Sequence, residues 1–161
     1  MLAAVKLLCV GKLKERYYID AFAEYQKRLG AFCRFTAEEL PEQRLSENPS
    51  EKEIAAALDK EAAEIEKHIP AGAVLAAFCV EGKLLSSEEL SRQMERWRNS
   101  GKSSVCFLIG GSCGLAERIK QNADLRLSVS RMTFPHHLFR VMAAEQIYRA
   151  FTISEGMKYH K

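Results

Sequence analysis

The chain has 161 residues, of which 47% are hydrophobic and 28% charged, as is typical of an ordinary soluble globular protein. Its formal net charge of +3 permits a polyanionic partner but does not demand one. No stretch approaches the ~18 apolar residues of a membrane-spanning helix. Residues 1–10 lack the cleavage site of a signal peptide and carry Lys6 within the apolar run. We therefore expect a single domain over residues 1–161, with neither a membrane span nor a secretory leader.

Strands and helices are predicted to alternate through the first half of the chain. The expected elements are a strand at 2–10, a helix at 12–29, a strand at 32–40, a polar loop at 41–49 and a helix from 50 to about 68. Ser50 and Glu53 have the spacing of a capping box, in which each side chain accepts a hydrogen bond from the other residue's backbone N–H. This pair therefore marks the start of the second helix, and Ser86 with Glu89, at the same spacing, marks the start of the helix at 86–99.

The second half continues the alternation. The expected elements are a strand at 73–80, a turn at 81–83, a helix at 86–99, a strand at 105–109, a short helix at 115–122, a strand at 125–130 and a helix from 135 to about 153. Residues 73–80 are continuously apolar, which is typical of a central parallel strand covered on both faces. The sequence thus predicts an α/β fold with a mainly parallel sheet and helices on both faces.

The last helix is predicted to be apolar almost all round. Steps of 100° per residue place Leu138, Val141 and Met142 on one side, and Ala143, Ile147, Ala150 and Phe151 on the other. A helix of this kind is buried on more than one face. One small domain covers one face, and a second subunit is the simplest cover for the rest, so we expect a homodimer.

Five cysteines indicate the redox compartment. They are Cys9, Cys33, Cys79, Cys106 and Cys113. Four of them fall within predicted strands, where a free cysteine behaves as a small apolar residue. We therefore expect a reducing compartment, the cytoplasm. Cys113 lies in a glycine turn, where a nucleophile is conceivable; chance occupancy is favoured, because no histidine is near in sequence to activate it.

Three loops follow predicted strands and are candidates for ligand binding, because ligands of parallel sheets lie beyond the carboxyl ends of the strands. They are the loop after Val80, the glycine turn Gly110–Gly114, and Ser130–Phe134. The turn reads G-G-x-x-G, so it lacks the dinucleotide fingerprint and the lysine of a P-loop. A Rossmann or flavodoxin-like oxidoreductase and a Walker-type nucleotide site are therefore disfavoured. The turn alone suggests a plain connection, but a second unusual loop after the next strand favours a ligand site.

Polar residues predicted on the last helix have a structural or a functional role. His136 and His137 open the helix, where they either transfer a proton or are simply surface groups; no spacing suits a metal. Glu145 precedes Arg149 by four residues, the favourable order for a helical ion pair. Arg140 falls among apolar residues, where an unpaired charge is costly, so it needs a partner or a phosphate. A functional role and an internal ion pair are equally compatible with that position.

Several motifs follow one another in a specific order and spacing: Val10–Lys14, Phe107–Gly111, Leu127–Ser128, Met132–His136, Arg140–Val141, Glu145–Ala150 and Tyr159–Lys161. Together they resemble the bacterial ribosomal RNA large-subunit methyltransferase H family of small SPOUT methyltransferases. The resemblance extends over essentially the whole chain. It implies a C-terminal trefoil knot, a rare exception to ordinary chain connectivity.

The resemblance also implies a function. Members of the family use S-adenosylmethionine to methylate N3 of a pseudouridine in 23S rRNA, in the helix 69 region, as homodimers. The expected substrate is rRNA within the large subunit or the 70S ribosome, with no metal and no membrane. The competing hypothesis is a non-catalytic RNA- or nucleotide-binding α/β module that has kept the fold.

Site residues follow from the same resemblance, position by position. The expected cofactor contacts are Phe78, Gly110, Gly111, Ser130, Arg131, Met132, Thr133 and Phe134. The expected catalytic residues are His137, His136 and Arg140, with the histidines as candidate proton acceptors. The expected RNA contacts are Arg140, Tyr159, His160 and Lys161.

Overall fold

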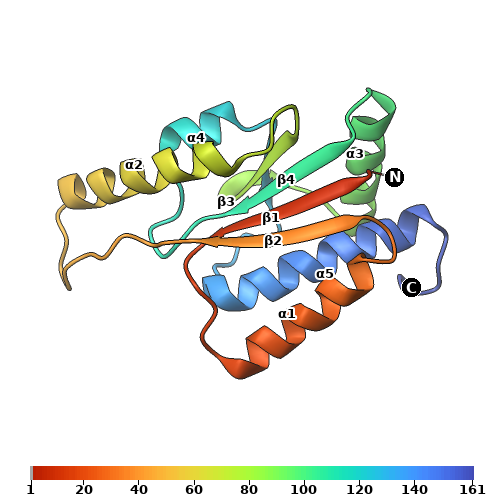
Figure 1. Ribbon diagram of the computed structural model, residues 1–161, viewed down its shortest axis with the longest axis horizontal. Helices are drawn as coiled ribbons and strands as arrows, with labels where there is room; N and C mark the ends of the chain where they lie inside the picture. Colours follow the sequence, from red (N-terminus) through yellow and green to blue (C-terminus); the bar gives the residue numbers. More distant parts are fainter. Residues whose placement is uncertain (1) are drawn as a thin grey trace.

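The computed structural model describes residues 2–161 and contains a five-stranded parallel sheet in the order β2-β1-β4-β3-β5 (Figure 1). The strands are β1 (Ala4–Val10), β2 (Arg34–Leu40), β3 (Val74–Leu84), β4 (Ser104–Ile109) and β5 (Leu125–Ser128). The helices are α1 (Arg16–Leu29), α2 (Glu51–His68), α3 (Ser87–Asn99), α4 (Glu117–Asn122) and α5 (His136–Ser154). The predicted alternation and the parallel sheet are confirmed. Within residues 2–161 no helix is long and apolar enough to cross a membrane.

Helices cover both faces of the sheet, as the apolar central strands require. α1, α3 and α5 pack on one face, and α2 with α4 on the other (Figure 1). Alternate residues of β4 face the two layers, with Phe107 on the first side and Leu108 on the second, and neither is exposed to solvent. Both predicted capping boxes are present, Ser50 with Glu53 and Ser86 with Glu89.

The start of α1 and the end of β5 differ from the prediction. α1 begins at Arg16 rather than at residue 12, because the preceding segment is extended and the Leu13 N–H donates to the Glu39 carboxylate at 2.7 Å. The predicted strand 125–130 ends at Ser128, where the Ser128 hydroxyl donates to the Ser130 carbonyl and turns the chain.

The cysteines behave as apolar residues. Cys9, Cys33 and Cys106 are buried, and burial raises the pKa of each thiol, to about 12, 11 and 12 respectively. These thiols therefore stay protonated at neutral pH. One detail of the prediction is wrong, since Cys33 lies one residue before β2 rather than within it.

β3 pairs with β5 in two registers. Leu127 of β5 pairs with Phe78 and, after a shift in register, with Lys83, so the predicted turn at 81–83 is part of an extended β3 that crosses close to β5. Gly82 lies at the point of closest approach, where a Cβ would be 2.7 Å from the carbonyl carbon of Leu127. This crossing brings the chain after β5 next to the ends of β3 and β4.

Every residue of α5 is buried or half-buried. The predicted inner side, Ala143, Ile147, Ala150 and Phe151, is fully buried in the core. The predicted outer side, Leu138, Val141 and Met142, is half-buried. The inner face is therefore confirmed, and the cover expected for the outer face stays a prediction.

We predict that Gly82→Ala destabilises the protein strongly, because the new Cβ meets the backbone of β5, which cannot move aside cheaply. The expected loss in free energy of unfolding is about 3 kcal/mol, measured by urea denaturation. Gly101→Ala is the control: it has open space and φ of +89°, so only the strain of that backbone conformation is expected, about 1 kcal/mol. A Gly82→Ala protein as stable as the wild type contradicts the tight crossing.

Candidate functional site

A cavity of about 450 Å³ lies beyond the carboxyl ends of β3, β4 and β5. The three loops that the sequence singled out supply its walls, at 78–81, 109–115 and 127–136. Of the expected cofactor contacts, Phe78, Gly110, Gly111, Ser130, Met132, Thr133 and Phe134 line this first cavity. Arg131 does not line it and is exposed. The exposed Cys113 lines the rim.

The glycine turn lines this cavity with main-chain atoms, and its geometry leaves little room for side chains. Gly111 and Gly114 form an antiparallel bridge, with the Gly114 N–H donating to the Gly111 carbonyl at 3.0 Å. A Cβ on Gly110 would lie 2.4 Å from the Gly114 carbonyl oxygen, and Gly114 has φ of +79°. The turn therefore folds tightly on itself and leaves backbone amides and carbonyls free to approach a ligand.

Glu42, from the loop after β2, holds the glycine turn from outside. One carboxylate oxygen accepts hydrogen bonds from the Ser112 N–H at 2.7 Å and from the Ser112 hydroxyl at 2.6 Å. A Cβ on Gly111 would come within 2.6 Å of the same oxygen. Partial burial raises the pKa of Glu42, but the two bonds from Ser112 outweigh it and the pKa is lowered overall. The carboxylate is thus ionised at neutral pH. Sequence reasoning missed this residue.

The loop that forms the opposite wall is folded by its own serines. The Ser128 hydroxyl donates to the Ser130 carbonyl at 2.8 Å, and the Ser130 hydroxyl accepts from the Met132 N–H at 2.9 Å. Met132 remains 74% exposed at the rim, an unusual position for a large apolar side chain. It is therefore available to contact a bound ligand.

The two histidines occupy different environments. His136 lines the first cavity and also a second one beside it, whereas His137 lines only the second. The His137 Nδ1 lies 2.9 Å from the Glu15 carboxylate, which fixes that ring. Burial, and then the neighbouring His137, lower the pKa of His136. At neutral pH His136 is therefore uncharged and able to accept a proton.

Arg140 makes the internal ion pair that the sequence left open. Its side chain is 3% exposed, with Nη1 2.5 Å from the Glu39 carboxylate and Nη2 donating to the Gly11 carbonyl at 3.0 Å. Nε is buried and has no partner among the described residues. Arg140 lines neither cavity; it binds Gly11, directly after β1, and Glu39, near the carboxyl end of β2.

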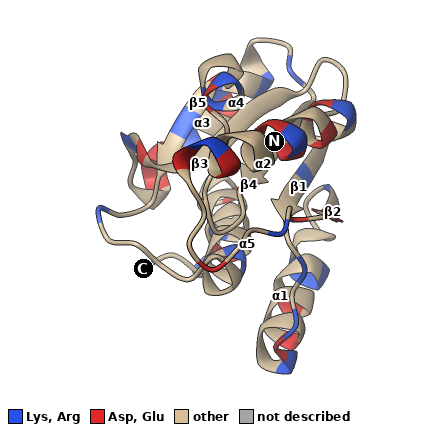
Figure 2. Ribbon diagram, turned by 90° about the vertical axis from the view of Figure 1, so that its left-hand side faces the viewer, with Lys and Arg blue, Asp and Glu red and all other residues tan. Residues whose placement is uncertain are grey.

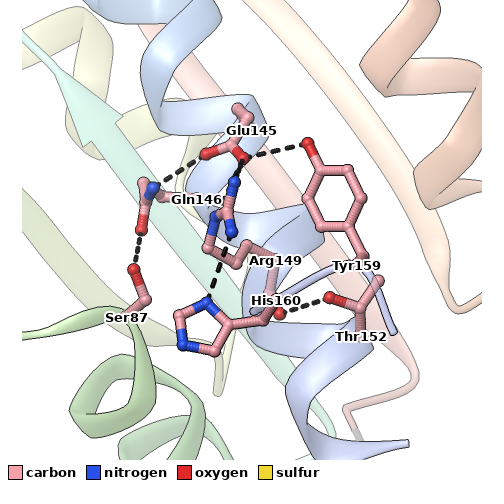
Figure 3. Close-up of polar contacts among 7 residues, drawn as sticks. All are labelled: Ser87, Glu145, Gln146, Arg149, Thr152, Tyr159 and His160. Carbon is pink, nitrogen blue, oxygen red and sulfur yellow. Dashed lines mark hydrogen bonds and ion pairs between the residues drawn. The ribbon is translucent and has the colours of Figure 1, made fainter. Parts of the chain in front are cut away.

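The carboxyl-terminal residues fold onto α5 and α3 (Figure 3). The Tyr159 hydroxyl donates to Glu145 at 3.0 Å, and Glu145 also forms the predicted ion pair with Arg149 at 2.5 Å. The His160 Nε2 lies 2.8 Å from Glu88, whose pKa is lowered to about 2 by its own backbone N–H, then by Ser86 and His160. These expected RNA contacts do not reach the first cavity of their own chain, and Lys161 is exposed.

The first cavity and its loops define the class of protein. A parallel sheet with a bare-backbone cavity at its carboxyl edge, between two tight loops, is the arrangement of an α/β protein that binds a nucleotide-like cofactor. No cluster of His, Cys, Asp or Glu within residues 2–161 is arranged to hold a metal ion.

Comparison with known proteins identifies the family. The model described as "Predicted SPOUT methyltransferase" matches residues 3–160, and the chain belongs to this family. It is 43% identical over 157 residues to "Ribosomal RNA large subunit methyltransferase H" of Listeria monocytogenes, and 44% identical to the proteins of that name from Bacillus pumilus and Clostridium botulinum. Each alignment covers 98% of this chain and 99% of the relative.

Solved structures show the same fold at low sequence identity. A probable methylase family protein from Haemophilus influenzae aligns with a TM-score of 0.55 at 12% identity, covering 100% of this chain and 72% of that one. A probable methyltransferase from Bordetella pertussis aligns at 0.54 and 14% identity, covering 92% of this chain and 96% of that one.

We predict that Glu42→Gln lowers the stability of the folded protein only at pH values at which the wild-type carboxylate is charged. The folded pKa of Glu42 lies below its ordinary value of 4.5, so its stabilisation is present above pH 4.5 and is lost as pH falls through the folded pKa. The expected loss near pH 7 is about 1 kcal/mol, allowing for partial exposure, with faster hydrogen exchange at the Ser112 amide. Urea denaturation at several pH values measures it.

Glu47→Gln, at an exposed position of the same loop, is the matched control and is expected to change neither quantity. A Glu42→Gln protein with wild-type stability and wild-type exchange at Ser112 would show that Glu42 does not hold the turn.

Proposed function

We propose that the protein is an S-adenosylmethionine-dependent methyltransferase that acts on N3 of a pseudouridine in 23S rRNA, in the helix 69 region. The observation that carries the proposal is the bare-backbone cavity between Gly110–Gly114 and Ser130–Phe134. Relatives of this chain that share its full length are named as methyltransferases of large-subunit ribosomal RNA. The substrate within the ribosome and the cytoplasmic location belong to the same proposal.

The first cavity fits the cofactor chemically. Main-chain groups of the glycine turn suit the polar edges of an adenine, and Phe78, Phe134 and Leu115 offer apolar surface for its faces. When bound, S-adenosylmethionine supplies an electrophilic methyl group on a sulfonium. The residues of the chain then have to orient the acceptor base, exclude water and remove one proton.

In this proposal, alignment of the reacting groups accounts for much of the rate enhancement. Holding the pseudouridine N3 in line with the sulfonium methyl supplies roughly 7–11 kcal/mol at best. When bound, the cofactor would give its methyl group from sulfur to N3 as the N3–H bond broke, so that S-adenosylhomocysteine and one proton would be left. His136 is the favoured acceptor of that proton, because it lines both cavities and its pKa is lowered. His137, held by Glu15, orients the neighbouring ring.

A trefoil knot is part of the proposal. It is supported by the shift in register between β3 and β5, in which Leu127 pairs with both Phe78 and Lys83. It is also supported by Gly82, where no side chain would fit against β5.

A homodimer is the second structural part of the proposal. The half-buried outer side of α5 supports it, because Val141 and Met142 line a further groove that shares Val129, Ser130 and Phe134 with the first cavity. A second subunit seated on that groove would complete the wall of the cofactor site. The carboxyl-terminal residues Tyr159 and His160 lie beside the same groove, on Glu145 and Glu88.

Methyl transfer to ribosomes tests the function directly. Purified protein and S-adenosylmethionine are incubated with 70S ribosomes and with separate large subunits from a strain that lacks the gene, and the rRNA is analysed by mass spectrometry. We expect one added methyl group, at N3 of a helix 69 pseudouridine. Calorimetry shows whether the protein takes the cofactor at all. Cofactor-independent RNA binding with no methylation would establish the non-catalytic module instead.

We predict that His136→Gln lowers kcat by about 10²-fold and removes the acid limb of the pH profile. In the wild type kcat should fall with decreasing pH only below the ordinary histidine value of 6.5, because the pKa of His136 is lowered. His137→Gln is the matched control, with a smaller loss of kcat and the acid limb intact. S-adenosylmethionine binding by each variant should stay near the wild type. Unchanged kcat in His136→Gln would remove its role as proton acceptor.

A further inference from the structure

A second cavity, of about 760 Å³, lies beside the first at the carboxyl ends of β1 and β2. Its walls come from residues 11–14 and 39–45, and it shares Ser112 and His136 with the first cavity. The strands in Figure 1 point to the left-hand side, and Figure 2 looks onto that side. Basic and acidic segments both face the viewer there, so the charge of the second cavity depends on which groups are already paired.

The carboxylates that line the second cavity are already engaged within the protein. Glu39 accepts from the Arg140 guanidinium at 2.5 Å and from the Leu13 N–H at 2.7 Å. Glu42 accepts two hydrogen bonds from Ser112. The charge of Glu39 is thus neutralised by Arg140, and the Glu42 carboxylate is held by hydrogen bonds from Ser112.

The cations that line it are not engaged. Lys12, Lys14 and Arg44 are exposed, and none of them takes part in an ion pair among residues 2–161. Some basic residues elsewhere are paired, such as Lys120 with Glu81 and Arg118 with Glu66. The second cavity therefore carries an uncompensated positive charge in a chain whose net charge is only +3.

We propose that the second cavity is the site for the RNA backbone next to the target nucleotide, with Lys12, Lys14 and Arg44 binding its phosphates. The proposal rests on the methyltransferase function above. Every nucleotide brings a phosphate with it, so a protein that acts on a base in one cavity must accommodate the adjoining phosphates nearby. The shared boundary at Ser112 and His136 is where the base passes from the second cavity to the methyl donor in the first.

This site also explains how a weakly basic protein holds a polyanion. Phosphate contacts fix register and orientation and make binding dependent on salt, and a few uncompensated cations at the right place suffice for that. Buried Arg140 contributes indirectly, by holding Glu39 and Gly11 and so shaping the two loops that carry the exposed cations.

The test replaces the three cations together, Lys12→Ala, Lys14→Ala and Arg44→Ala. The control variant is Lys27→Ala, Arg34→Ala and Lys102→Ala, which removes the same number of lysines and arginines from exposed positions toward the amino ends of the strands. A third variant keeps the charges, with Lys12→Arg, Lys14→Arg and Arg44→Lys. Three quantities are measured: S-adenosylmethionine affinity by calorimetry, KM and kcat on ribosomes, and the salt dependence of binding to a synthetic helix 69 RNA.

The cavity variant is expected to bind S-adenosylmethionine like the wild type, but its KM for ribosomes should rise at least about tenfold. The slope of log K for RNA binding against log salt concentration should become shallower by about two. The control variant should resemble the wild type, and the charge-conserving variant should keep the wild-type salt slope. A cavity variant with wild-type KM and salt slope overturns the proposal. If the wild type transfers no methyl group, the proposed function fails, and the salt slopes for RNA still decide whether the second cavity binds phosphates.

Discussion

The pairing of Leu127 with both Phe78 and Lys83 is the constraint on which the rest of the structure depends. It requires β3 to continue to Leu84 with a shift in register against β5, and it requires Gly82 at the crossing, where a Cβ would strike the β5 backbone. Because β5 is held there, the chain after it turns at once and places residues 128–136 opposite the glycine turn that follows β4. The first cavity is therefore a consequence of topology rather than of any single side chain.

The site consists of two cavities that meet at Ser112 and His136 and have different linings. The first presents main chain and apolar side chains, which suits a nucleoside cofactor, and the second presents exposed cations, which suits a phosphate backbone. Glu42 and Glu39 stabilise the wall between them, because Glu42 is bonded to Ser112 of the glycine turn and Glu39 to Arg140 of α5. The ring of His136, uncharged at neutral pH, lies at the boundary between the two cavities.

Local sequence patterns predicted most of the fold. Apolar periodicity gave the order of strands and helices, and the Ser–x–x–Glu spacing located the starts of α2 and α3. The extension of β3 to Leu84 was not predictable in this way, because Lys83 and Leu84 are strand residues only through pairing with β5, more than forty residues later in the chain. Local rules also end a strand at a glycine, whereas Gly82 is required here by a contact.

The site shows the same limit. The glycine turn and the loop at 130–134 were recognisable from composition and family motifs, but the partners that shape them were not. Glu42 meets Ser112 across 70 residues of sequence, and Glu39 meets Arg140 across 101. No local pattern marks either carboxylate. The lysines after β1 lay within a recognised motif, yet their lack of ion-pair partners was visible only in three dimensions.

A crystal structure of the protein with S-adenosylmethionine is the most direct measurement of the central claim, that bare main chain brought together by the β3–β5 crossing forms the cofactor site. The predicted result is the adenosine moiety between Gly110–Gly114 and Ser130–Phe134, with its base bonded to backbone amides and carbonyls and its methyl group directed toward His136. A cofactor bound elsewhere, or those two loops too far apart to contact it together, would contradict the claim.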